Sequence, residues 1–186
     1  AGHGIGQRLV ESHKVDAISF TGSIEVGKGI ASAAVQNLTR VQMEMGSKNA
    51  LAVMDDADID LAVSIALGGA FGGSGQKCTA SSRLVVHRKV HDLFVDRLVA
   101  GAKIMKVGHA LDADTQIGPV VSEQQLSDNM FYVDLAVKEG AERLCGGERL
   151  QMATDGYYMS PGVFVGTSND MRINREEMFA PLACVI

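Results

Sequence analysis

The sequence predicts a layered α/β fold in which short strands alternate with longer helices and pair in parallel. Two observations favour this fold. Hydrophobic residues make up 46% of the 186 residues and charged residues 21%, which is enough apolar content for a buried core. Short apolar segments rich in β-branched residues recur along the chain, and segments of helical period separate them. We find no internal repeat or low-complexity tract.

In the first part of the chain, a glycine-rich start leads into the first expected helix, and Thr21–Ser23 forms a turn between a strand and the second helix. The expected helices cover residues 5–13 and 24–37, and the expected strands cover residues 17–20, 40–45 and 50–54.

The remaining chain continues the alternation. A helix over residues 60–71 has its cap near Asp58, and the glycines of residues 68–75 are expected to break it into a loop. Ser122 and Gly140 mark the start and the stop of a later helix. The other expected elements are a helix over residues 90–105 and strands over residues 83–87, 143–145, 162–166 and 182–186.

Composition excludes several classes of protein. The formal net charge of −5 leaves no basic surface for a phosphate backbone, so we expect no nucleic-acid partner. The longest uncharged stretch, Leu61–Gln76, is rich in glycine and shorter than the ~20 residues of a bilayer span, so we expect no membrane segment. The three cysteines are odd in number and widely spaced, which favours a reducing, cytoplasmic compartment over a disulfide framework.

Three apparent ligand motifs each fail at a required position. Gly22–Gly29 has the spacing of a phosphate-binding loop, but Gly29 stands where Ser or Thr must hold Mg²⁺. Asp56–Asp60 resembles the start of a calcium loop without its glycine and glutamate. His87 and His91 lack a third ligand at a suitable spacing. We therefore predict no metal site, whereas the helix start after Gly22 still favours a phosphate or pyrophosphate.

Cys78 is the candidate nucleophile among the three cysteines. It follows the glycine loop Gly72–Gly75, where its sulfur is expected to be accessible and backbone N–H groups to be free, and Lys77 could stabilise a thiolate. The alternative, a small buried hydrophobic residue, stays open for Cys78 and is our interpretation of Cys145 and Cys184.

Two acidic segments are candidates for further roles. Glu44 lies in the strand over residues 40–45, and its carboxylate is either solvated or held in an apolar pocket, where it could act as a base. Glu176–Pro181 pairs two acids with an aromatic residue and a proline, which alone indicates only a loop before the last strand.

Taken together, four motifs in this order resemble the aldehyde dehydrogenase superfamily. They are Phe20–Ser23 with Val26–Gly27, Glu44–Asn49, Gly75–Cys78 and Glu176–Pro181. The interval from Glu44 to Cys78 also fits, and the resemblance covers the whole chain. Residues 1–45 resemble the C-terminal part of a Rossmann-like NAD(P)-binding domain, and residues 46–186 resemble an α/β catalytic domain truncated at its C-terminus. Members are over twice this long, and the chain has no initial Met, so we expect a fragment.

The resemblance implies oxidation of a small-molecule aldehyde to a carboxylic acid, with NAD or NADP as the hydride acceptor. Cys78 would attack the aldehyde, its backbone N–H would supply half of the oxyanion hole, and Glu44 would activate the water that hydrolyses the thioester. Ser23 would contact the pyrophosphate, Glu177 the nicotinamide ribose and Phe179 the ring. The full set of implied cofactor-binding residues is Gly22, Ser23, Val26, Met45, Gly46, Glu177 and Phe179.

This sequence departs from the family pattern at two positions, where Ser47 and Ala180 replace usual glycines. The asparagine that completes the oxyanion hole is expected upstream, so we expect the isolated chain to have little or no activity. Coenzyme-A-acylating relatives generally lack the glutamate, which leaves acylation of coenzyme A as an alternative. A second alternative is a non-catalytic nucleotide-binding or structural fragment.

Two further expectations come from the resemblance. The sequences of residues 45–49 and 76–83 are similar to those of the family branch that oxidises semialdehydes such as 2-oxoglutarate semialdehyde. Family members are usually dimers or tetramers, so the parent enzyme is expected to be a homodimer or a homotetramer.

Overall fold

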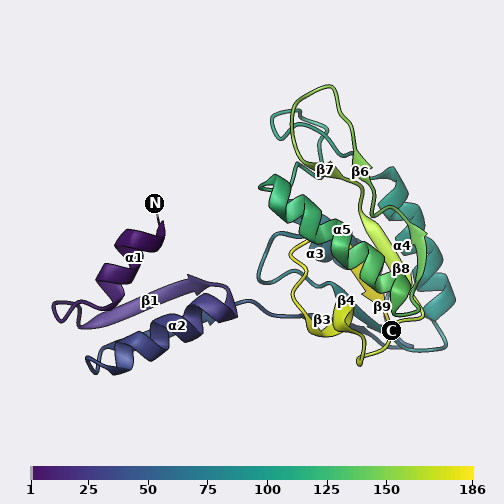
Figure 1. Cartoon of the computed structure of the whole chain (residues 1–186). Helices are drawn as coiled ribbons and strands as arrows, with labels where there is room; N and C mark the ends of the chain where they lie inside the picture. Colours follow the sequence, from purple (N-terminus) through teal and green to yellow (C-terminus); the bar gives the residue numbers. More distant parts are fainter. Residues whose placement is uncertain (1) are drawn as a thin grey trace. The chain divides into compact units, whose positions relative to one another are not determined.

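The computed structural model describes residues 2–186, with side chains from residue 4 onward, and the chain forms two compact units (Figure 1). The first unit extends to Gly46 and the second comprises Ser47–Ile186.

The first unit is a β-α-β arrangement preceded by a helix. Its elements are α1 (Gly2–Val10), β1 (Ala17–Gly22), α2 (Ile24–Val35) and β2 (Arg40–Met45). β1 and β2 pair in parallel, with Thr21 opposite Glu44 and Gly22 opposite Met45. Gly27 lets α2 pack closely on β2, because a Cβ atom at this position would lie 2.5 Å from the Met45 sulfur.

The second unit contains a five-stranded sheet in the order β3-β4-β9-β8-β5. Its strands are β3 (Ala50–Val53), β4 (Arg83–Val86), β5 (Glu142–Cys145), β8 (Gly162–Val165) and β9 (Leu182–Val185). The pairs β3-β4, β4-β9 and β9-β8 are parallel, and β5 is antiparallel to β8. All four residues of the central strand β9 are buried.

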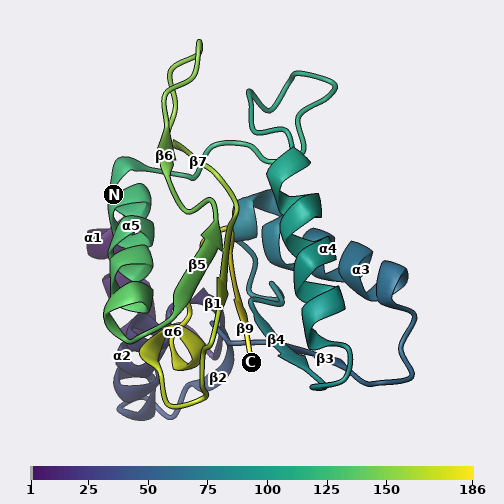
Figure 2. The same ribbon diagram turned by 90° about the vertical axis from the view of Figure 1, so that its right-hand side faces the viewer.

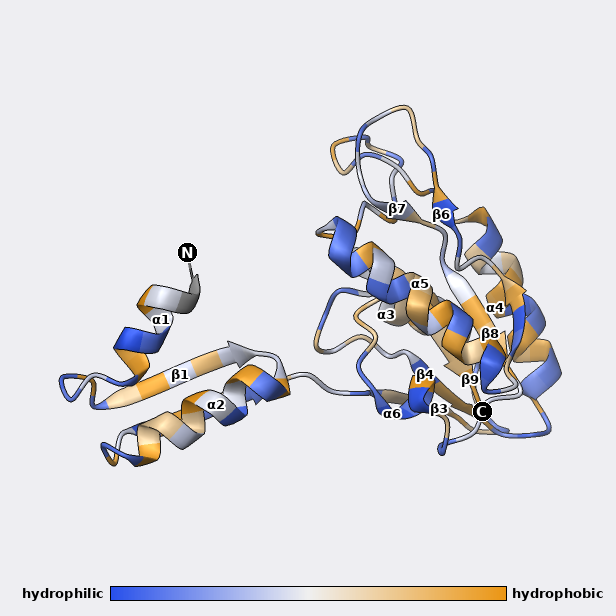
Figure 3. Cartoon of the chain, viewed as in Figure 1, coloured by the Kyte–Doolittle hydropathy of each residue, from blue (hydrophilic) through white to orange (hydrophobic). Residues whose placement is uncertain are grey.

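Helices cover both faces of this sheet (Figure 2). The helices α3 (Ile59–Phe71) and α4 (His91–Ile104) pack in one hydrophobic cluster with Ala183 and Val185 of β9. The helix α5 (Glu123–Lys138) packs in the other cluster with Leu182 and Cys184. Alternate residues of β9 therefore face opposite layers, as expected for a strand buried on both sides. Figure 3 shows α5 changing between hydrophilic and hydrophobic along its length.

Three small elements were not expected from the sequence. The strands β6 (Arg149–Leu150) and β7 (Tyr158–Met159) form a separate antiparallel pair, and α6 (Arg172–Arg175) is a single helical turn. Segments of two to four residues are too short to show a period of alternation or of helix, which is why the sequence did not reveal them.

Other expectations are corrected in detail. Thr21 and Gly22 continue β1 instead of forming a turn, because they pair with Glu44 and Met45. The predicted parallel pairing fails at β5. Gly68 and Gly69 remain inside α3, and the break comes at the 3₁₀ segment Gly72–Gly75. The first helix covers residues 2–10 rather than 5–13, and the second ends at Val35.

Candidate active site

The loop that carries Cys78 has an unusual backbone. Gly73, Ser74 and Gly75 have φ values of 62°, 59° and 67°, in the left-handed region that favours glycine. A Cβ atom on Gly75 would lie 2.0 Å from the Ala180 carbonyl oxygen, so this loop and the chain before β9 are in backbone contact. The Cys78 side chain beyond the loop is exposed, as predicted.

Side-chain hydrogen bonds hold this loop from several directions. The Ser74 hydroxyl donates to the Gly118 carbonyl at 2.8 Å, and the Val121 N–H donates to Gln76 Oε1 at 2.9 Å. The Ser47 hydroxyl and the Asn49 side-chain amide both donate to the Cys78 carbonyl. Within residues 2–186, no acceptor takes the backbone N–H of Cys78. An accessible sulfur beside an unused N–H donor is the arrangement that a thiol nucleophile with an oxyanion hole needs.

The segment before β9 holds one of its two half-buried acids by hydrogen bonds and leaves the other without such a partner. Arg172 donates to the two oxygens of Glu176 at 2.7 and 3.0 Å, and this bond is the main reason that the Glu176 pKa lies below its usual value. Glu177 forms no hydrogen bond or ion pair with any residue that the structure describes. It is therefore available to a ligand.

Phe179, two residues after Glu177, has a φ of 52°. Its carbonyl accepts a hydrogen bond from Gln125 Nε2 at 3.3 Å. Glu177 and Phe179 border a cavity of about 320 Å³ together with Gln125 and Tyr132 of α5. A carboxylate and an aromatic ring at one opening suit a ribose and a planar ring.

In the first unit, the start of α2 has free hydrogen-bonding capacity. Ser23 is the N-cap, and its hydroxyl oxygen accepts the Val26 N–H at 3.3 Å, which leaves the hydroxyl proton free to donate. The helix N-terminus behind it attracts negative charge. Gly22 leaves room for the Phe20 ring, since a Cβ atom would lie 2.5 Å from the tip of that ring.

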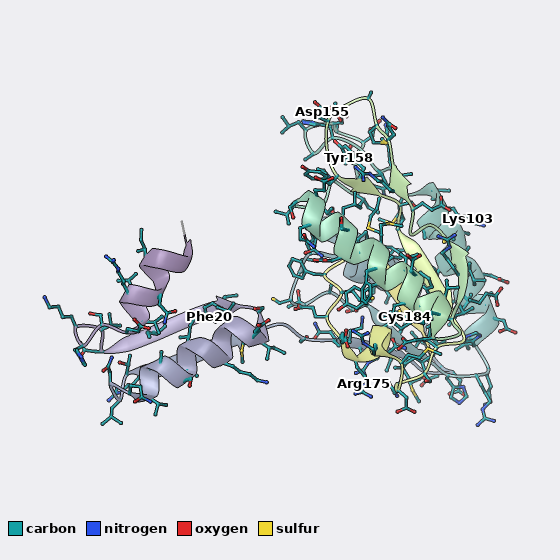
Figure 4. The ribbon with its side chains drawn as sticks, in the orientation of Figure 1. Phe20, Lys103, Asp155, Tyr158, Arg175 and Cys184 are labelled. Carbon is teal, nitrogen blue, oxygen red and sulfur yellow. The ribbon has the colours of Figure 1, made fainter. Side chains whose placement is uncertain are left out.

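Beside this helix start lies an apolar cavity of about 600 Å³. It is lined by Phe20, Val26 and Ile30 among others, and Figure 4 shows Phe20 on β1. A polar helix start bordering an apolar cavity of this size fits a nucleotide, with its phosphates at the helix and its base against apolar side chains. These residues of this unit therefore fit the dinucleotide that the sequence implied.

The remaining predicted residues lie at the end of β2. Glu44 is exposed in the structure, and Met45 and Gly46 are half-buried. Cys78, Glu177 and Phe179 belong to the second unit, whereas Gly22, Ser23, Val26 and Glu44–Gly46 belong to the first. Of the two other cysteines, Cys184 is buried as predicted (Figure 4), and Cys145 is only half-buried, at the edge strand β5.

Sequence reasoning missed the contacts that the last three residues of the Glu44–Asn49 motif make. Ser47 and Asn49 both donate to the Cys78 carbonyl, and Lys48 between them has its ammonium group buried without a hydrogen-bond partner. The contacts join residues about thirty positions apart, and no local pattern of the sequence indicates such a pairing.

Burial is the main reason that the pKa of Lys48 is lowered from 10.5 to about 8, and the Arg83 charge lowers it further. Cys184 and Glu177 act in the opposite direction and do not compensate. The Lys48 amine binds its proton more tightly in the unfolded chain than in the folded one. The charge on Lys48 therefore destabilises the folded state at pH 7.

Replacing Lys48 with Met is expected to raise the free energy of unfolding at pH 7 by on the order of 3 kcal/mol. The advantage should shrink as the pH rises from 8 to 10.5, where the unfolded chain also loses the proton. Burial raises the Cys184 pKa to about 11, which gives a pH dependence of opposite sign in both proteins, and the variant lacks the Lys48 charge that lowers this pKa. Urea unfolding of both proteins at pH 7 and pH 10 measures the difference, and an advantage independent of pH would contradict this explanation.

Residues 2–186 contain no cluster of three or more His, Cys, Asp or Glu side chains arranged to hold a metal ion. No helix in this part of the chain is long and apolar enough to cross a membrane.

Comparison with known proteins gives the family. Residues 1–186 match the Aldehyde dehydrogenase family. The chain is 39% identical over 184 residues to alpha-ketoglutaric semialdehyde dehydrogenase of Bacillus subtilis, covering 98% of this chain and 38% of that protein. It is 43% identical over 180 residues to betaine aldehyde dehydrogenase 1 of Oryza sativa, covering 97% of this chain and 36% of that protein.

Solved structures of aldehyde dehydrogenases share the fold of this chain. A betaine aldehyde dehydrogenase of Staphylococcus aureus in complex with NAD⁺ has a TM-score of 0.97 and 39% identity, covering all of this chain and 37% of that one. The likeness confirms the predicted α/β fold class. The chain thus spans well under half the length of the relatives it matches. On the match of its whole length and on this shared fold, the chain belongs to the aldehyde dehydrogenase family.

Proposed function

We propose that this chain is part of a longer enzyme that oxidises an aldehyde to a carboxylic acid with NAD⁺ or NADP⁺. The observation that carries the proposal is the accessible Cys78 thiol on a loop with an unused backbone N–H. In this proposal residues 1–45 are the C-terminal part of the NAD(P)-binding domain, and residues 46–186 are part of the catalytic domain. The relatives' length supports activity of a longer protein rather than of this chain alone.

Cys78 is the nucleophile in this reaction. Its thiolate forms a bond to the aldehyde carbon, and the carbonyl oxygen becomes the oxyanion of a thiohemiacetal. The Cys78 N–H donates to that oxyanion and stabilises it. The nicotinamide, when bound, supplies the acceptor for the hydride that leaves the same carbon. A thioester on Cys78 then remains to be hydrolysed.

Glu44 is the general base that activates water for this hydrolysis. The Glu44 side chain is exposed and forms no hydrogen bond or ion pair with any residue that the structure describes. Covalent geometry adds support that does not depend on the arrangement of the two units. Only three residue steps join Glu44 to Ser47, so their Cα atoms are at most about 11 Å apart. Ser47 in turn donates to the Cys78 carbonyl at 3.3 Å.

Different parts of the cofactor are assigned to different residues. Ser23 and the start of α2 bind the pyrophosphate, with Gly22 allowing close approach and Val26 in the cavity of the base. Glu177 accepts hydrogen bonds from the nicotinamide ribose, and Phe179 flanks the ring. Met45 and Gly46 are the remaining residues that we assign to cofactor binding. The NAD⁺ complex of the S. aureus relative supports NAD⁺, and NADP⁺ is the second candidate.

The substrate class we favour is a semialdehyde of a 2-oxo acid. The similarity to the B. subtilis alpha-ketoglutaric semialdehyde dehydrogenase supports this substrate class. The similarity to a betaine aldehyde dehydrogenase supports betaine aldehyde as the competing substrate. We further propose that the enzyme is a cytoplasmic homodimer or homotetramer.

The complete enzyme containing this chain tests the proposal by product and by thiol labelling. Incubation with NAD⁺ and 2-oxoglutarate semialdehyde or betaine aldehyde should give NADH and the free acid without coenzyme A. Iodoacetamide should label Cys78 faster than Cys145 or Cys184, and NAD⁺ with aldehyde should slow that labelling. Equally slow labelling of all three cysteines, or a product that requires coenzyme A, would overturn the proposal.

A further inference from the structure

The segment that follows Glu44 makes direct contact with the Cys78 loop. Asn49 Nδ2 donates to the Cys78 carbonyl at 2.7 Å, and Ser47 Oγ donates to the same oxygen at 3.3 Å. A carbonyl oxygen has two lone pairs, so it can accept both bonds at once. The first distance is that of a strong hydrogen bond and the second that of a weak one.

The donor is held more firmly than the acceptor. Asn49 directly precedes β3, and its own carbonyl accepts the Arg83 N–H of β4 at 3.3 Å. Cys78, in contrast, lies in a turn outside any helix or strand, and its side chain is exposed. Core packing therefore does not position the thiol, and its backbone must be fixed by hydrogen bonds.

Two anchors lie on either side of the thiol. Before it, Gln76 accepts the Val121 N–H at 2.9 Å, and after it the Cys78 carbonyl is held by Asn49 and Ser47. Fixing these two points leaves little freedom for the Cys78 backbone between them. The N–H and the Cα–Cβ bond of Cys78 are then held in one orientation, so the sulfur is confined to the positions that rotation about this bond allows.

We propose that Asn49, supported by Ser47, is a positioning residue that orients Cys78 for attack. The inference rests on the proposed role of Cys78 as nucleophile. Ser47 adds a second bond, which the glycine usual at this position in the family could not make because it has no hydroxyl to donate. Loss of the Asn49 bond lets the loop move, and a displacement of about 1 Å at the reacting atom can cost a factor of 10² in rate.

The test compares Asn49→Asp, Asn49→Ala and Ser47→Gly in the complete enzyme. Asp keeps the size of Asn and loses the N–H donor, so it separates the hydrogen bond from packing. We expect both Asn49 variants to lower kcat by on the order of 10- to 100-fold, with the KM for aldehyde and NAD⁺ within about threefold of the wild type. Ser47→Gly should have a smaller effect of the same kind, since its bond is longer.

A second readout needs neither substrate nor cofactor. Amide hydrogen exchange followed by mass spectrometry should become about tenfold faster in residues 76–82 of the Asn49 variants and remain unchanged in α5. Asn37→Ala is the matched control, because Asn37 also donates its side-chain amide to a backbone carbonyl, that of Glu11, at 3.1 Å. It should change neither the exchange of residues 76–82 nor kcat.

The outcomes separate this inference from the proposed function. If the wild type does not oxidise aldehydes while exchange in the variants accelerates, the anchor stands and the proposed function fails. If Asn49→Asp and Ser47→Gly both exchange at the wild-type rate in residues 76–82, the positioning role is overturned. Wild-type kcat in Asn49→Asp would overturn it as well, whatever the exchange shows.

Discussion

Replacing Glu44 with Gln in the complete enzyme is expected to stop the reaction after one turnover per active site. Gln is similar in size to Glu but cannot accept the proton of water, so hydride transfer should proceed and hydrolysis should not. Rapid mixing should show a burst of about one NADH per site, followed by a steady rate lower by on the order of 10²- to 10⁴-fold. Mass spectrometry should find the acyl group on Cys78.

The matched control is Glu142→Gln, which changes an exposed glutamate on β5 in the same way. It should leave both the burst and the steady rate unchanged. Turnover of Glu44→Gln at the wild-type rate would show that another group activates the water. Release of the trapped acyl group by coenzyme A would instead show that this enzyme transfers acyl groups to that acceptor.

Gly75→Ala is expected to have the largest effect on stability among the glycine substitutions near the site. The φ of 67° is unfavourable for Ala, and its Cβ would lie 2.0 Å from the Ala180 carbonyl oxygen, which is backbone and cannot rotate away. We expect a loss of about 3 kcal/mol or more in the free energy of unfolding, measured in urea. The displaced loop should also lower the alkylation selectivity of Cys78.

Gly68→Ala provides the control within the preceding helix. Gly68 is exposed in the interior of α3, and a Cβ atom there meets nothing within 4 Å. Ala should therefore raise the free energy of unfolding by about 0.5–1 kcal/mol. Equal effects of the two substitutions would show that the left-handed backbone at Gly75 is not required.

The long elements of the fold could be predicted because local signals agree with the tertiary structure there. Ser122 caps α5 through the Gln125 N–H at 3.1 Å, and Gly140 just beyond its end has a φ of 100°. The strand over residues 40–45 is confirmed with the predicted bounds. The direction of β5 could not be predicted, because no local pattern states which neighbour a strand pairs with or in which sense.

The site was predictable only in part for a related reason. The exposure of Cys78 follows from glycines that break a helix, which is a local property. The partners of its carbonyl, Asn49 and Ser47, and the burial of Lys48 arise from contacts between distant segments. A single sequence carries no record of such contacts, so the structure was needed to find them.

The position of β9 has a consequence for biosynthesis. This strand lies between β4 and β8 in the sheet. The strand pairs β3-β4 and β8-β5 are therefore not joined into one sheet until residues 182–185 are in place. A nascent chain leaving the ribosome therefore carries the β3-β4 pair, complete at Val86, with an unpaired inner edge until Leu182–Val185 is synthesised, and the β5-β8 pair, complete at Val165, also has an unpaired inner edge until then. Such edges are open to aggregation, which makes this region a good candidate for chaperone protection during translation.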